Sequence, residues 1–101
     1  MKLNWTKEAL QRLQAIEDYI ARDNIKAAGG FVDKLIYLAE TLVDNPRKGR
    51  VVPELSIENI RELLHKNYRI VYLVKKNSIE ILTVFEGHQL LKKDEVLKDK
   101  S

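Results

Sequence analysis

Two neighbouring apolar segments, Tyr68 to Lys75 and Ile79 to Glu86, constrain the fold more than any other feature. Both carry apolar residues at alternate positions on either side, which is typical of β-strands covered on two faces. The Lys76-Asn77 pair between them suits a hairpin turn. We therefore expect two central antiparallel strands. The predicted faces are Ile70, Tyr72 and Val74 against Arg69, Val71 and Leu73, and then Ile79, Ile81 and Phe85 against Leu82 and Val84.

Two stretches before Pro46 place apolar residues three and four positions apart, a spacing that predicts amphipathic helices. The first begins after a cap candidate, Thr6, and stops near residues 22–24. The second extends over residues 28–43 and ends at Asn45-Pro46. Because only a few residues join them, the two helices should form an antiparallel hairpin.

Short segments on either side of these elements complete the expected sheet. Met1 to Trp5 alternates loosely and predicts an edge strand. Residues 57–66 predict another strand, although ENIRELLHK could also form a helical turn or two. The expected class is α+β, in the order β-α-α-β-β-β, with the hairpin on one face of a small, mainly antiparallel sheet. We assign residues 1–91 to a single domain and 92–101 to a charged C-terminal tail.

Composition excludes several classes of function. The chain has no cysteine, so disulfides and thiolate metal sites are ruled out, which is compatible with the cytosol. The N-terminus has no apolar run like that of a signal peptide, and no segment is long enough to span a membrane. Familiar catalytic and phosphate-binding spacings are missing, and two histidines alone make no metal site. We expect a cytoplasmic protein without a cofactor or a membrane partner.

Positive charge is concentrated in the middle of the chain. Residues 45–76 contain eight lysines and arginines against three acidic residues, a net charge of +5, whereas the whole chain carries +3. This favours an anionic partner, either nucleic acid or an acidic protein segment, while the alternative is lysines guarding a sheet edge. The candidate binding residues are Arg50, Arg61, Lys66 and Arg69.

The end of the last strand offers groups for acid–base chemistry. A metal-free ribonuclease needs a base, an acid and cations for the phosphate. Glu86 and His88 are two residues apart and share a side in an extended strand, so they are the candidate proton-transfer pair, with Arg61 and Arg69 on the phosphate. The alternative is ordinary surface polarity. Arg69 could likewise serve only to pair with Glu62 or Glu80.

An ordered set of short motifs resembles the RelE/ParE toxin superfamily over residues 3–91. The strongest block comprises Ile60-Arg61-Glu62-Leu63, Asn67-Tyr68-Arg69-Ile70-Val71-Tyr72 and Ile79-x-Ile81-Leu82-x-Val84-Phe85. Further matches are Trp5-Thr6-x-x-Ala9, Asp18-Tyr19-Ile20, Ala27-Ala28-x-x-Phe31-Val32, Asn45-Pro46, Gly49-Arg50 and Val52-Pro53-Glu54-Leu55.

The resemblance implies the toxin of a type II toxin–antitoxin module, neutralised by a cognate antitoxin. ParE-like members poison DNA gyrase and have no known nuclease activity, whereas RelE-like members cut mRNA in the ribosome. The long hairpin and the Gly-Arg-x-x-Pro-Glu-Leu region favour the ParE branch. His88 keeps the RelE-like nuclease function as an alternative hypothesis. A third hypothesis is an inactive relative that only binds its antitoxin. We expect the antitoxin on the sheet face away from the hairpin, covering Arg61, Arg69 or their neighbours.

Overall fold

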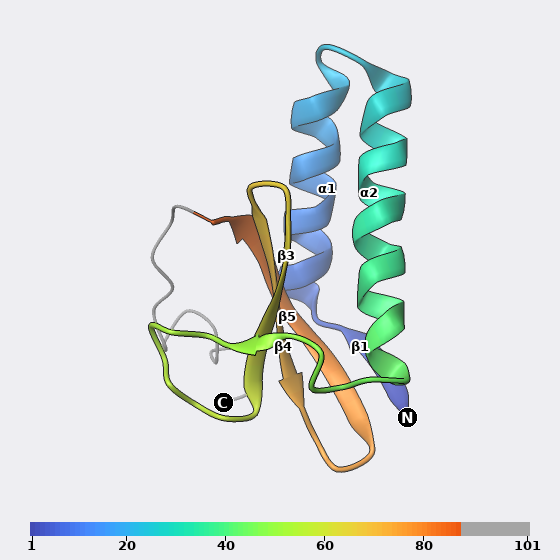
Figure 1. Ribbon diagram of the computed structural model, residues 1–101. Helices are drawn as coiled ribbons and strands as arrows, with labels where there is room; N and C mark the ends of the chain where they lie inside the picture. The colour runs from blue at the N-terminus through green and yellow to red at the C-terminus, as the bar shows by residue number, and fades with distance from the viewer. Residues whose placement is uncertain (88–101) are drawn as a thin grey trace.

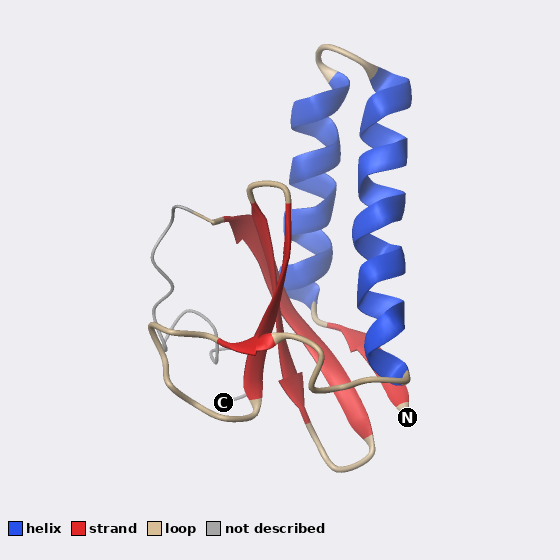
Figure 2. Cartoon of the chain, in the orientation of Figure 1, coloured by secondary structure: helices blue, strands red, loops and turns tan. Residues whose placement is uncertain are grey.

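A helix hairpin packs on one face of a five-stranded sheet (Figures 1 and 2). The computed structural model describes residues 1–87. The elements in chain order are β1 (Lys2–Trp5), α1 (Lys7–Ala21), α2 (Ile25–Glu40), the 3₁₀ turn η1 (Thr41–Val43), β2 (Arg50–Val51), β3 (Ile60–His65), β4 (Tyr68–Val74) and β5 (Ser78–Glu86). The predicted α+β class and element order are confirmed; the two-residue β2, too short to carry a pattern, was not predicted.

The strand order is β1-β5-β4-β3-β2, so β4 and β5 occupy the predicted central positions. β1 is the predicted edge strand and runs parallel to β5, while the other pairs are antiparallel. Residues 57–66, for which the sequence allowed either a strand or a helical turn or two, contain the strand β3. None of the helices within residues 1–87 has the length and apolar character needed to cross a membrane.

Side-chain caps fix where the two helices begin. The Thr6 hydroxyl accepts a hydrogen bond from the Ala9 backbone at 3.1 Å, and the Asn24 side chain accepts one from the Ala27 backbone at 3.0 Å. α2 therefore starts at Ile25, three residues before the apolar pattern begins. The hairpin lies against the sheet through a core that includes Leu13, Leu35, Ile70, Tyr72 and Ile81.

The other face of the sheet carries a second, smaller core. Val52, Ile60, Val71, Leu82 and Phe85 are buried there, and Leu55 and Ile57 pack against them. We call residues 52–57 the strap, because this segment crosses the face away from α1 and α2 (Figure 1). Both faces of the central strands are covered as predicted, one by helices and the other by an irregular segment.

A β-bulge in β5 corrects one predicted face. Val71 pairs with Thr83 but the next residue, Tyr72, pairs with Ile81, so Leu82 is the extra residue. Phe85 consequently lies in the second core rather than beside Ile79 and Ile81, and Val84 takes its place on the helix side. The Thr6 hydroxyl is within hydrogen-bond distance of the carbonyls of Ile81, at 2.9 Å, and Leu82, at 3.0 Å. A prediction of strand faces from strict alternation in the sequence cannot detect such an inserted residue.

Candidate functional site

The two arginines proposed to hold one phosphate lie on opposite faces of the sheet. Arg61 stands opposite Tyr72, whose side chain belongs to the helix-side core. Arg69 stands opposite Phe85, which belongs to the second core. Directly paired residues share a face, so the two guanidinium groups cannot converge on a single phosphate. The prediction that both are displayed on the face away from the hairpin is wrong.

Arg69 is buried beneath the strap, with 5% of its surface exposed. Its Nε donates to Glu62 Oε1 at 2.5 Å, and its Nη1 and Nη2 donate to the two Glu54 oxygens at 2.6 and 2.8 Å. The Phe85 ring centroid lies 5.1 Å from the guanidinium carbon. A buried arginine needs such partners, because desolvating an unpaired cation is costly. Of its two predicted partners, Arg69 therefore pairs with Glu62, whereas Glu80 pairs with Lys75.

Arg50 joins the same cluster from β2. Its Nε donates to Glu62 Oε2 at 2.6 Å, so the fully buried Glu62 carboxylate accepts from two arginines. We call Arg50, Glu54, Glu62 and Arg69 the ion network. The hydrogen bonds from Arg69 to Glu54, followed by those to Glu62, raise the pKa of Arg69 against the opposing effect of burial. The network joins the strap to three strands, β2, β3 and β4.

Arg61 holds the loop that enters β2. Its Nη1 donates to the Gly49 carbonyl at 2.9 Å, and the Gly49 N–H donates to the Tyr72 hydroxyl at 2.9 Å. That hydroxyl in turn donates to the Pro46 carbonyl at 2.8 Å. Burial raises the pKa of Tyr72, although the Gly49 hydrogen bond and Arg61 oppose the shift. Within residues 1–87 the buried Arg61 Nε has no hydrogen-bond partner.

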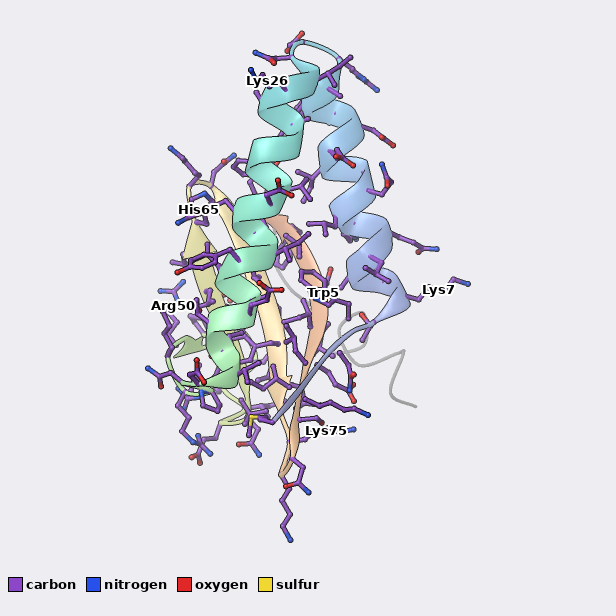
Figure 3. All side chains as sticks on the ribbon, turned by 90° about the vertical axis from the view of Figure 1, so that its right-hand side faces the viewer. Trp5, Lys7, Lys26, Arg50, His65 and Lys75 are labelled. Atoms are coloured by element: carbon purple, nitrogen blue, oxygen red, sulfur yellow. The ribbon has the colours of Figure 1, made fainter. Side chains whose placement is uncertain are left out.

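Lys66 lies in the turn between β3 and β4, where its φ of 56° places it in the left-handed region. The adjacent His65 contacts Phe31 of α2, with ring centroids 5.6 Å apart, and Phe31 meets Tyr68 edge-on at 5.3 Å. Figure 3 shows His65 above Arg50 on the same side of the view. Because Arg61 and Arg69 face opposite ways and Lys66 lies in a turn, the predicted anion-binding residues do not form one patch.

We expect His65 to lower the free energy of unfolding as the pH falls. Burial, and then Lys34 and Lys66, lower the pKa of His65 from its usual 6.5. Unfolding then takes up a proton once the pH falls below 6.5, so the free energy of unfolding decreases until the lower, folded pKa is passed. Urea denaturation at a series of pH values should show this loss, and His65→Gln should flatten it. Lys34→Met should reduce it in part. An unchanged slope in His65→Gln would contradict the assignment.

Glu86 ends β5 beside Asn67, whose Nδ2 lies 3.5 Å from Glu86 Oε2. Its proposed partner, His88, lies outside the described residues. Burial, and then the charge of Glu86, raise the pKa of Tyr68. Among residues 1–87, no cluster of three histidine, cysteine or acidic side chains could hold a metal ion.

Sequence reasoning missed a pocket of about 170 Å³ between α1 and the ends of β4 and β5. Its lining combines apolar and polar residues: Arg12, Ala15, Ile16, Tyr19, Tyr68, Val84, Phe85 and Glu86. Arg12 is also paired with Glu8 at 2.7 Å. Tyr19, part of the Asp18-Tyr19-Ile20 motif, is a large exposed residue and lines this pocket.

The fold is shared with toxin–antitoxin proteins. One similar solved structure is described as the chromosomal ParDE TA system from P. aeruginosa; it is 25% identical, with a TM-score of 0.70, over 85% of this chain and 95% of that one. A curated relative, "Putative toxin Y4kP" of Sinorhizobium fredii, is 34% identical over 90 residues, which is 87% of this chain and 90% of the relative.

The family model for the ParE toxin of type II toxin–antitoxin systems, parDE, matches residues 3–91. The chain therefore belongs to the ParE toxin family. The expected resemblance is confirmed, together with its lean toward the ParE branch. Membership in a two-component module implies an antitoxin partner.

Proposed function

We propose that this chain is a cytoplasmic growth inhibitor that acts on DNA gyrase and is neutralised by its cognate antitoxin. The observation that carries the proposal is the position of the arginines that a nuclease would need. Arg69 is bound by two carboxylates, Arg61 holds a backbone carbonyl, and the two face opposite ways. A protein that binds and poisons a target needs no phosphate-holding centre, so this arrangement supports inhibition by binding.

The decisive test compares the two targets side by side. Purified protein added to a gyrase supercoiling assay should trap cleaved DNA, and the same preparation should leave mRNA intact in a translating ribosome extract. Addition of the antitoxin should abolish the gyrase effect. Cleaved mRNA with unaffected supercoiling would overturn the proposal, and silence in both assays with antitoxin binding retained would indicate an inactive relative.

One observation favours a RelE-like ribonuclease as the second candidate. Arg12, Tyr68 and Glu86 line the same pocket, so a cation, a hydroxyl and a carboxylate lie within reach of one small ligand. In this alternative Glu86 and His88 move protons. The combined Glu86→Gln and His88→Ala substitutions should abolish growth inhibition if the nuclease operates. Full toxicity in that variant would remove this candidate.

We propose that the antitoxin docks on the sheet face away from the hairpin, beyond the strap. Leu64 projects there, since it pairs with Arg69 and 54% of its surface is exposed. Leu64→Glu should weaken antitoxin binding by about tenfold or more, because an exposed apolar anchor is lost. Leu10 of α1, 52% exposed, provides the matched control. Calorimetry should show Leu10→Glu binding normally; the reverse pattern would place the antitoxin on the hairpin.

A further inference from the structure

We infer that the Arg69 fork, the paired Nη1 and Nη2 groups, is a carboxylate receptor that the strap occupies with its own Glu54. The external ligand of this receptor is a carboxylate side chain, flanked by apolar residues, in an acidic segment of a partner protein. Glu54 thus acts as an internal ligand, and a partner gains the site by displacing the strap. This inference does not depend on whether gyrase is the target.

The receptor is assembled without Glu54. Glu62 of β3 fixes the guanidinium through Nε at 2.5 Å, and the Phe85 ring lies 5.1 Å from its central carbon. Arg50 in turn holds the other oxygen of Glu62 at 2.6 Å. These contacts come from the sheet and leave Nη1 and Nη2 directed at the strap, where both oxygens of Glu54 accept from them. A two-pronged donor of this kind matches the geometry of one carboxylate.

The strap is attached to the sheet mainly through side chains. Among the described residues, its backbone bonds are local or at its ends: Leu55 and Ser56 donate to the Val52 carbonyl, and Val52 donates to Ile60. Ser56 adopts a φ of 52°, a left-handed conformation that is unfavourable for a residue other than glycine. Lifting the middle of the strap therefore breaks apolar contacts and the Glu54 ion pair, but no ladder between strands.

The surface under the strap defines what can replace it. Arg69 shares this face of the sheet with Val71, Leu82 and Phe85, all buried. The strap covers this surface with the sequence Val52-Pro53-Glu54-Leu55, in which an acidic residue lies between apolar residues. A partner segment with the same apolar–acid–apolar pattern would supply the same contacts, which extends the site beyond a simple anion-binding position.

The test removes the internal ligand and offers external ones. Glu54→Ala should have a lower Tm than wild type, and sodium propionate should restore part of that loss relative to sodium chloride at equal ionic strength. The acetylated and amidated peptide VVPELSI should bind this variant about tenfold more tightly than VVPQLSI, since a charge-assisted bidentate contact is lost in the latter. Wild type should bind either peptide weakly, because its tethered Glu54 competes.

Glu58→Ala is the matched control, since Glu58 is an exposed acid that pairs with Arg47 just beyond the strap. It should respond to neither propionate nor peptide. No propionate effect on a folded Glu54→Ala, or equal binding of both peptides, would overturn the inference. Equal rescue by sodium phosphate would reject the carboxylate specificity.

A second measurement covers the case in which Glu54→Ala does not fold. In the wild type, the amides of Leu55 and Ser56 should exchange hydrogen about 100-fold faster than those of Ile70 and Val71, because the strap opens without global unfolding. If the strap amides and the β4 amides exchanged at the same rate, the strap would not open separately from the sheet. That result would overturn the proposal.

Discussion

Replacing Glu62 by glutamine is expected to lower the free energy of unfolding by about 3–5 kcal/mol, the range typical for breaking a buried ion pair. The side chain is fully buried and its two oxygens accept from Arg69 at 2.5 Å and Arg50 at 2.6 Å. Glutamine keeps the shape but removes the charge that offsets the desolvated guanidinium of Arg69. Urea denaturation of the two proteins at neutral pH measures the difference.

Glu58 gives the comparison that separates burial from charge. It also pairs with an arginine, Arg47, at 3.3 Å, but 77% of its side chain is exposed. Glu58→Gln should therefore change stability by less than about 0.5 kcal/mol, as exposed ion pairs usually do. Similar losses for the two substitutions would mean that the burial of the ion network contributes nothing to its strength.

Gly49→Ala is expected to destabilise the fold by about 3 kcal/mol, at the upper end of the effects of overpacking. A Cβ at this position would collide with the backbone carbonyl of Glu62 and lie 2.6 Å from the Tyr72 hydroxyl. Backbone atoms cannot rotate away, so the loop must move and its hydrogen bonds with Tyr72 and Arg61 must lengthen. Thermal denaturation should report a lower Tm.

Gly29→Ala tests the same substitution in open space. Gly29 lies inside α2 and a Cβ there would meet nothing within 4 Å. Alanine in a helix interior should instead raise stability by roughly 0.5–1 kcal/mol. Opposite signs for the two glycines are the expected result; no loss at Gly49 would mean that this position is not limited by the contact described.

Most of the architecture could be predicted because periodicity reports burial. The helices, the edge strand and the central hairpin all follow from apolar spacing. The face of Phe85 could not, because the bulge at Leu82 is set by pairing across strands. The strap could not either, since its apolar residues have no period; it is held by packing on Val71 and Leu82 and by the ion pair between Glu54 and Arg69.

The candidate site was harder to predict, for an electrostatic reason. Sequence gives the number of charges but not their partners, and Arg69, a candidate binding residue, is paired with Glu54 and Glu62 in the fold. Arg61 is similarly engaged by a carbonyl that only the fold brings near. The pocket beside Tyr19 arises where α1 meets β4 and β5, which are distant in sequence, and the exposure of Leu64 is set by which face of β3 it takes.

The position of β5 between β1 and β4 has a consequence for biosynthesis. Lys2 to Trp5 pair with Ser78 to Ile81, so β1 must wait for the synthesis of β5 before it has a neighbour in the sheet. A ribosome-bound chain that lacks this last segment cannot close its sheet, because the piece that joins both sides is missing. Chains that end before Ser78 should therefore be unable to form this sheet.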